Sequence, residues 1–177
     1  MTDKQKVLIS EFIETLPEDE KQEFKEIINY LEKLGYIPQK QKVKDFVLSF
    51  KHNINGKIIA KMGIRGQKGF LSIKFFACKN VPEKYVKALG ENSDDVYTCL
   101  SPPDRDKLLP NEIMLKCTLF CGACTGGQMR YYYQYPNGNE IFRCSAYPVL
   151  LPHITKNDMD DLKRLISEQH NYFLSIA

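Results

Sequence analysis

Four cysteines lie close together in the C-terminal half of the sequence, in a pattern suited to metal binding or redox chemistry. Cys117, Cys121 and Cys124 form a C-x3-C-x2-C motif, and Cys144 follows a tyrosine-rich stretch. Both spacings fall within the range that zinc ligands use. Four thiolates fill a tetrahedral zinc shell and leave no position open for a substrate. The sequence therefore predicts a structural zinc site, with zinc as the cofactor.

The same cysteines are compatible with other chemistry. Cys121 and Cys124 form a C-x2-C pair, which in a dithiol redox enzyme or redox sensor would cycle between dithiol and disulfide. Such a pair normally has one thiol at a helix N-terminus, whereas this pair leads into a predicted strand. Reduced cysteines without metal are a further alternative. Radical S-adenosylmethionine enzymes also use C-x3-C-x2-C, but early in a large barrel, and here only 53 residues follow Cys124.

A predicted β-hairpin is the element that would bring Cys144 back to the other cysteines. The strongest hairpin signal is YYYQYPNGNEIF, residues 131–142, and its Pro-Asn-Gly at 136–138 suits a three-residue loop with a G1 bulge. That loop pairs Cys144 with Arg130, whereas a two-residue Asn-Gly loop would pair it with Tyr131. In either register Cys144 returns to the base of the hairpin, where the loop with the C-x2-C pair ends.

The base of the hairpin also carries residue types that bind ligands. Guanidinium groups and tyrosine rings together suit a planar or anionic ligand. The predicted ligand-binding residues are Arg130, Tyr132, Arg143 and Tyr147. In the alternative interpretation, the tyrosines pack on the core and the arginines pair with carboxylates such as Glu140. The sequence thus predicts a site for an unidentified small molecule or protein where the hairpin meets the sheet.

The remaining cysteines and the histidines show no ligand pattern of their own. Cys78 ends a predicted strand and is expected to be a small buried hydrophobe, whereas Cys99, in a long loop, could replace an assigned ligand. His52, His153 and His170 show no metal-ligand pairing, although His153 could approach the metal. Hydrolase, P-loop and dinucleotide motifs are absent, so no catalytic residue is assigned and no enzyme activity is predicted.

Helices and strands with clear periodicity must support this hairpin. Helices are predicted over 4–15, from Pro17 to Gly35, from Pro82 to about Leu89, and after an N-cap at Thr155 with Asp158 three residues on. Three strands with Gly-bearing turns are predicted within 43–77. The expected buried faces are Phe24, Ile27, Ile28, Leu31 and Leu34; Phe46, Leu48 and Phe50; Ile58, Ala60, Met62 and Ile64; Leu71, Ile73, Phe75 and Ala77; and Met159, Leu162, Ile166 and Phe173.

These elements predict a single α+β domain over residues 1–177. It consists of N-terminal helices, an antiparallel β-meander, a cysteine-bearing hairpin and a C-terminal helix. The zinc hairpin is expected to occupy 117–147, and 91–111 is expected to be a long loop, because it is polar and interrupted by prolines.

Composition and net charge narrow the classes of protein to which this chain can belong. A hydrophobic content of 43% indicates a folded globule, and no stretch approaches the ~20 apolar residues of a membrane span. Without a signal-peptide pattern we expect a soluble, cytoplasmic protein, where reducing conditions favour metal binding over disulfides. The net charge of +3 argues against a dedicated nucleic-acid surface. A nucleic-acid-associated zinc module using Lys40, Lys42 and Lys44 with the tyrosines is an alternative.

The stretch RYYYQYPNGNEIFRCSAYPVLLPHIT, followed by DLKRLISEQHNYF, resembles a group of uncharacterised bacterial proteins. That group combines a C-terminal cysteine cluster, a tyrosine-rich hairpin and a final helix, and FVLSF, IAKMGIR and LSIKFFACK also fit its pattern. The helix–meander–helix part is more loosely similar to YdhG-like α+β domains of unknown function. The resemblance implies the fold and supplies no activity or catalytic residue.

Overall fold

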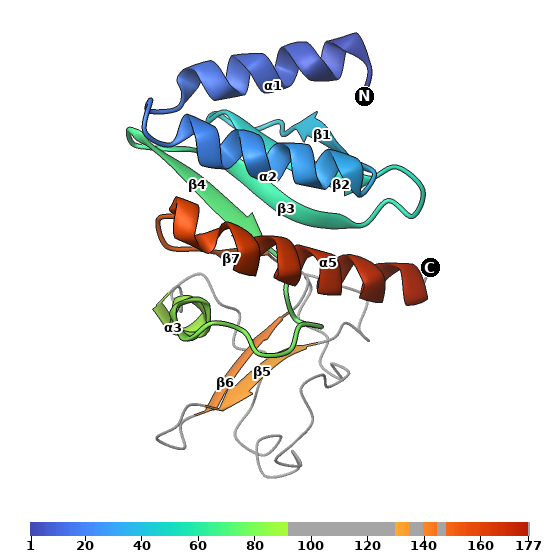
Figure 1. Cartoon of the computed structure of the whole chain (residues 1–177), viewed down its shortest axis with the longest axis vertical. Helices are drawn as coiled ribbons and strands as arrows, with labels where there is room; N and C mark the ends of the chain where they lie inside the picture. Colours follow the sequence, from blue (N-terminus) through green and yellow to red (C-terminus); the bar gives the residue numbers. More distant parts are fainter. Residues whose placement is uncertain (92–129, 135–139, 145–147, 177) are drawn as a thin grey trace.

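The structure is a computed structural model that describes residues 1–91, 130–134, 140–144 and 148–176 (Figure 1). The helices are α1 (Asp3–Thr15), α2 (Lys21–Lys33), α3 (Glu83–Glu91) and α5 (Met159–Ser175), the last preceded by a 3-10 turn (Lys156–Asp158). The strands are β1 (Tyr36–Lys40), β2 (Val47–His52), β3 (Ile58–Arg65), β4 (Lys68–Ile73), β5 (Arg130–Gln134), β6 (Glu140–Cys144) and β7 (Val149–Leu150). The predicted loop over 91–111 lies outside the described residues, apart from the end of α3.

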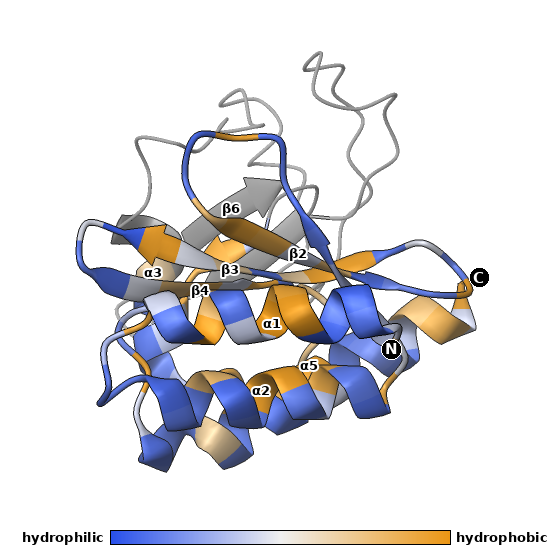
Figure 2. Ribbon diagram, turned by 90° about the horizontal axis from the view of Figure 1, so that it is seen from above, coloured by the Kyte–Doolittle hydropathy of each residue, from blue (hydrophilic) through white to orange (hydrophobic). Residues whose placement is uncertain are grey.

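Five of the strands form one antiparallel sheet in the order β1-β2-β3-β4-β7, and β5 and β6 form a separate hairpin. Helices α1, α2 and α5 lie along one face of the sheet (Figures 1 and 2). This arrangement confirms the predicted α+β class. Within the described ranges, no helix combines the length and apolar character needed to cross a membrane.

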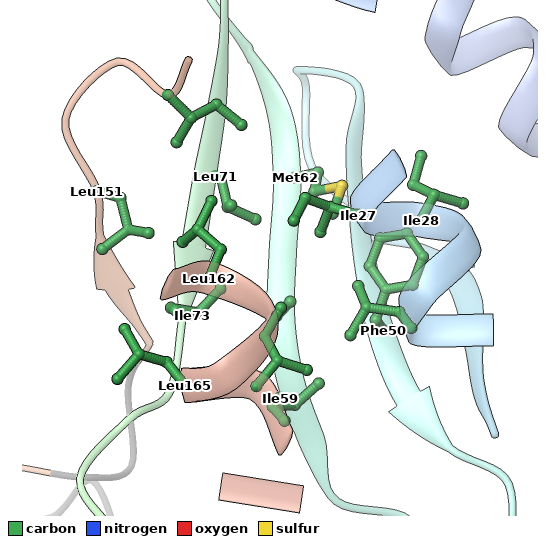
Figure 3. Close-up of a cluster of buried hydrophobic side chains, with 14 of the residues drawn as sticks. Ile27, Ile28, Phe50, Ile59, Met62, Leu71, Ile73, Leu151, Leu162 and Leu165 are labelled. Atoms are coloured by element: carbon green, nitrogen blue, oxygen red, sulfur yellow. The ribbon is translucent and has the colours of Figure 1, made fainter. Parts of the chain in front are cut away.

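The core lies between the sheet and helices α2 and α5, and Figure 3 shows side chains from all these elements converging there. The helical spacing of α2 buries Phe24, Ile27, Ile28 and Leu31, as predicted. The strand alternation likewise buries Leu48, Phe50, Ala60, Met62, Leu71 and Ile73. Burial of these apolar side chains is the main force that holds the helices on this face of the sheet.

The helix ends follow local capping chemistry, with one departure from prediction. Around the start of α5, the Asp158 carboxylate accepts hydrogen bonds from the backbone N and Oγ1 of Thr155, at 2.7 and 3.0 Å. Pro17 was expected in the first turn of α2, but it lies in a turn before the helix. There its carbonyl accepts from Glu20 N at 3.0 Å, and α2 begins at Lys21.

The sheet is larger than the predicted three-strand meander. Strand β1 was missed because Pro38 cannot donate to a ladder, but β1 is an edge strand, where proline is tolerated. Strand β7 has only two residues, too few for a periodic pattern. A bulge between β2 and β3 pairs Phe50 with Ala60 and Lys51 with Ile58. Ile59 is therefore the extra residue and is fully buried, whereas Ile58, predicted on the core face, is only half-buried.

Candidate functional site

The β5–β6 hairpin that carries Cys144 forms with a defined register. Gln134 pairs with Glu140, Tyr132 with Phe142, and Arg130 with Cys144. This is the register that a three-residue turn requires, and it excludes the pairing of Cys144 with Tyr131. Cys144 therefore stands at the open end of the hairpin, directly opposite the first residue of β5.

The other three predicted zinc ligands, Cys117, Cys121 and Cys124, lie outside the described residues. The distance of Cys124 from Cys144 is limited by the chain itself, because Arg130 comes six positions after Cys124 and an extended chain of that length spans at most about 20 Å. Among the described residues, no three His, Cys, Asp or Glu side chains form a group that could hold a metal ion. The predicted four-cysteine set has only Cys144 within that part of the chain.

The predicted ligand-binding residues occupy different positions on the hairpin. Arg130 and Tyr132 alternate along β5 and pair with Cys144 and Phe142, whereas Arg143 pairs with Tyr131. Alternate positions on a strand belong to opposite faces, so Arg130 and Tyr132 occupy positions on the face of Cys144, and the position of Arg143 belongs to the other face. Tyr147 lies outside the described residues. The ligand set stays a prediction, and the register divides it between two faces.

The hairpin is positioned by α3 and by the sheet. Helix α3 contacts both β6 and β7, and β7 pairs with β4 at the edge of the sheet. The chain passes from Cys144 to β7 within a few residues, so the cysteine end of the hairpin is tied to the sheet edge. This edge is the junction where the sequence predicts ligand binding.

Cys78 has the structural role predicted for it. The side chain is 1% exposed, and its thiol donates to the carbonyl oxygen of Leu165 on α5, with Sγ 3.1 Å from that oxygen. Burial raises the pKa of the Cys78 thiol well above its usual range. Because the thiolate is the reactive form of cysteine, Cys78 is chemically inert in the folded protein.

A cluster of two histidines and a tyrosine was missed by the sequence analysis. The His52 and His170 rings have centroids 5.4 Å apart, and Tyr36 contacts both rings. The three side chains are all buried, and His170 Nδ1 lies 3.3 Å from the Tyr36 hydroxyl oxygen. On β2, His52 Nδ1 accepts a hydrogen bond from Asn55 N at 3.4 Å.

These three aromatic residues join the open end of the β1–β2 pair to α5. Tyr36 pairs directly with His52 in the sheet, and Asn55 Nδ2 donates to the carbonyl oxygen of Phe173 at 3.4 Å. His170 lies four residues after Ile166 and three before Phe173, which places it on the apolar stripe of α5. That spacing was the available signal that His170 is buried, whereas nothing local links it to His52.

Burial lowers the pKa of His170 below its ordinary value of about 6.5, and the nearby His52 lowers it further. The unfolded chain therefore binds more protons than the folded chain once the pH falls below about 6.5. We expect the free energy of unfolding to fall as the pH is lowered from 7.5 to 5.5, and His170→Gln to reduce that fall. Urea unfolding at the two pH values measures both.

A control for this pH effect is Asn171→Gln, which changes a neutral, exposed side chain next to His170 on α5. This variant should keep the fall in stability between the two pH values. Equal pH dependence in the parent and in His170→Gln would contradict the role of His170.

His153 contacts a carboxylate rather than standing near the described cysteine. Its Nδ1 lies 3.5 Å from Glu20 Oε1, and the Glu20 side chain is buried. The second carboxylate oxygen of Glu20 accepts from Gly69 N at 2.7 Å, so this side chain links the start of α2 to β4. Together these contacts tie the segment after β7 to the helical layer.

Comparisons of the chain with protein-family models, with curated proteins and with solved structures found no match. The resemblance to uncharacterised bacterial proteins and to YdhG-like domains therefore stays a prediction. Function must be inferred from the residues and the geometry of this chain.

Proposed function

We propose that the protein is a binding module whose hairpin is held by a zinc ion bound to Cys117, Cys121, Cys124 and Cys144. The observation that supports this proposal is the pairing of Arg130 with Cys144. This pairing puts Cys144 at the open end of the hairpin. The segment with Cys117, Cys121 and Cys124 leads into the same end, at Arg130. The ligand of the module is a small molecule or a protein.

Zinc suits these residues because two antiparallel strands alone are marginally stable in water. A closed four-thiolate site would supply the missing stability, since metal binding and folding are coupled in small metal sites. A closed site also leaves no coordination position for a substrate. The metal would therefore have a structural role, and binding would take place on the protein surface beside it.

The ligand site we propose lies where the hairpin approaches the sheet edge through α3 and β7. Arg130 and Tyr132 are its main members, because their positions share the face of Cys144. Arg143 and Tyr147 would contribute from the other face and from the segment after β6. A guanidinium beside a tyrosine ring favours a ligand with a carboxylate, a phosphate or a planar group.

The decisive experiment replaces Cys121 and Cys124 singly by serine. If both are zinc ligands, each variant should lose bound zinc and unfold at a lower temperature, because binding of the metal contributes to folding. Cys99→Ser is the matched control, since it removes a cysteine outside the proposed ligand set and should keep both metal content and melting temperature.

The alternative, a dithiol redox protein, predicts a different outcome. Either serine variant would then keep the parent melting temperature, and the remaining thiol would trap a mixed disulfide with a partner. A thermal melt run beside a non-reducing gel distinguishes the two. Unchanged melting of both variants together with such a trapped disulfide would contradict the zinc proposal.

A further inference from the structure

Charge is strongly segregated between the layers of this fold, although the whole chain carries only +3. The segment 36–78, which forms four of the five sheet strands, contains nine Lys or Arg residues and one acidic residue, Asp45. The segment 1–35, which forms α1 and α2, contains nine acidic and five basic residues. The five strands themselves contain no Asp or Glu. The sheet is therefore the basic side of the molecule.

The sheet topology gathers part of this charge at one end. In antiparallel order, the end of β1, the start of β2, the end of β3 and the start of β4 lie side by side, as can be followed in Figure 1. The β1–β2 connection and the β3–β4 turn are therefore neighbours. The basic residues at this end, which we name the basic rim, are Lys40, Lys42, Lys44, Arg65 and Lys68.

The charges of the basic rim are open to a partner. All five side chains are exposed, and none forms an ion pair within the described part of the chain. Some lysines on the helices differ in this respect, because Lys21 pairs with Glu18 and Lys163 pairs with Glu26. The β1–β2 connection also contains Asp45, so this end of the sheet carries five cations and one carboxylate of its own. Cations concentrated in this way attract a polyanion and speed its association.

An aromatic ring lies beside Arg65 on the face of the sheet opposite the helices, whereas the strand position of Lys40 belongs to the helix face. Phe70 of β4 packs on Gly63 of β3, where a Cβ at position 63 would lie 2.5 Å from the ring. The guanidinium carbon of Arg65 stands 5.9 Å from the centroid of the same ring. Phe70 is only partly buried.

We propose that the basic rim binds single-stranded nucleic acid, with its lysines and Arg65 on the backbone phosphates and Phe70 as a stacking surface for a base. Single-strand sites in proteins combine a cationic track with aromatic rings in this way. The rim extends over about 14 Å from β1 to β4, at about 4.8 Å per strand, so the site covers a few nucleotides. It is independent of the cysteine hairpin.

Single-stranded nucleic acid fits this surface better than a membrane. A lipid surface takes up exposed apolar side chains, and in the β1–β2 connection and the β3–β4 turn only Val43 is a large exposed hydrophobic residue. Phe70 is partly buried beside Arg65, where a single base can stack on its ring. The charges suit both partners, so the test includes vesicles.

Fluorescence anisotropy with a short labelled single-stranded DNA of mixed sequence tests the proposal on the full chain. Five phosphate contacts give a slope of about −3.5 for log K against log salt, so affinity should fall about 100-fold between 50 and 200 mM salt. The Arg65→Glu/Lys68→Glu variant should bind at least about 10-fold more weakly and lower the slope by about 1.4. Lys42→Glu/Lys44→Glu, in the exposed connection, should have a similar effect.

The matched control is Lys4→Glu/Lys25→Glu, which changes the net charge equally on exposed positions of the helical layer. It should keep the parent affinity within about two-fold if binding is local to the basic rim. The proposal is overturned if this control weakens binding as much as the rim variants do. It is also overturned if binding shows no salt dependence, or if vesicles of anionic lipid compete for the rim while an excess of unlabelled single-stranded DNA does not.

Discussion

We expect the Phe24→Ala variant to unfold with a free energy about 3–5 kcal/mol below that of the parent protein. Phe24 is 1% exposed and comes from α2. Its ring meets the ring of Phe12 from α1 edge to face, with centroids 5.9 Å apart. The same ring packs over Gly69 of β4, where a Cβ would lie 2.8 Å from Phe24 Cε2. One side chain therefore holds two helices and a strand together.

Chemical denaturation followed by circular dichroism measures this loss. Leu174→Ala is the control, because Leu174 is 47% exposed at the end of α5 and its truncation should change stability by less than about 0.5 kcal/mol. A loss below about 1 kcal/mol for Phe24→Ala would mean that α1 and α2 are not packed on β4 as described.

The second large effect is expected from Gly63→Val, which should lower the free energy of unfolding by about 3 kcal/mol. A Cβ at this position would lie 2.5 and 2.7 Å from Phe70 Cε1 and Cζ. It would also lie 2.9 Å from the backbone oxygen of Phe46, which cannot rotate away. Both Phe70 and the start of β2 must shift, so the pairing of β2, β3 and β4 is strained.

A double variant separates the two contacts of Gly63. Gly63→Val/Phe70→Leu removes the ring but keeps the backbone oxygen, so it should recover part of the lost stability and not all of it. Denaturation curves of the single and double variants give the coupling free energy between positions 63 and 70. Full stability in Gly63→Val alone would show that Phe70 does not lie on position 63, and it would remove the aromatic surface from the nucleic-acid proposal as well.

Much of the fold follows from local periodicity in the sequence. The stripe on α2 and the alternation in β2 to β4 identify most of the core, because each pattern is compatible with only one kind of element. Elements that depend on partners far along the chain were not predictable in this way. Strand β1 contains Pro38 and is allowed by its place at the sheet edge, and β7 exists only because β4 supplies its hydrogen bonds.

In the candidate site, too, local patterns are predictable from the sequence and contacts between distant residues are not. The Pro-Asn-Gly turn predicted the hairpin and limited Cys144 to two partners, Arg130 or Tyr131, and the structure has the pairing with Arg130. The contact between His52 and His170 joins residues more than a hundred positions apart, so no local pattern contains it. Lys40, Lys42 and Lys44 of the basic rim were named from the sequence as an alternative nucleic-acid surface, but Arg65 and Lys68 join them only through the order of the strands in the sheet.

The central claim is that four cysteines hold one structural zinc ion. Elemental analysis of protein purified without chelators tests it most directly, with the protein concentration taken from amino-acid analysis. We predict about one zinc per chain, because four thiolates complete one tetrahedral shell. A folded, metal-free protein in which all the cysteines except the buried Cys78 react with a thiol reagent under native conditions would contradict the account.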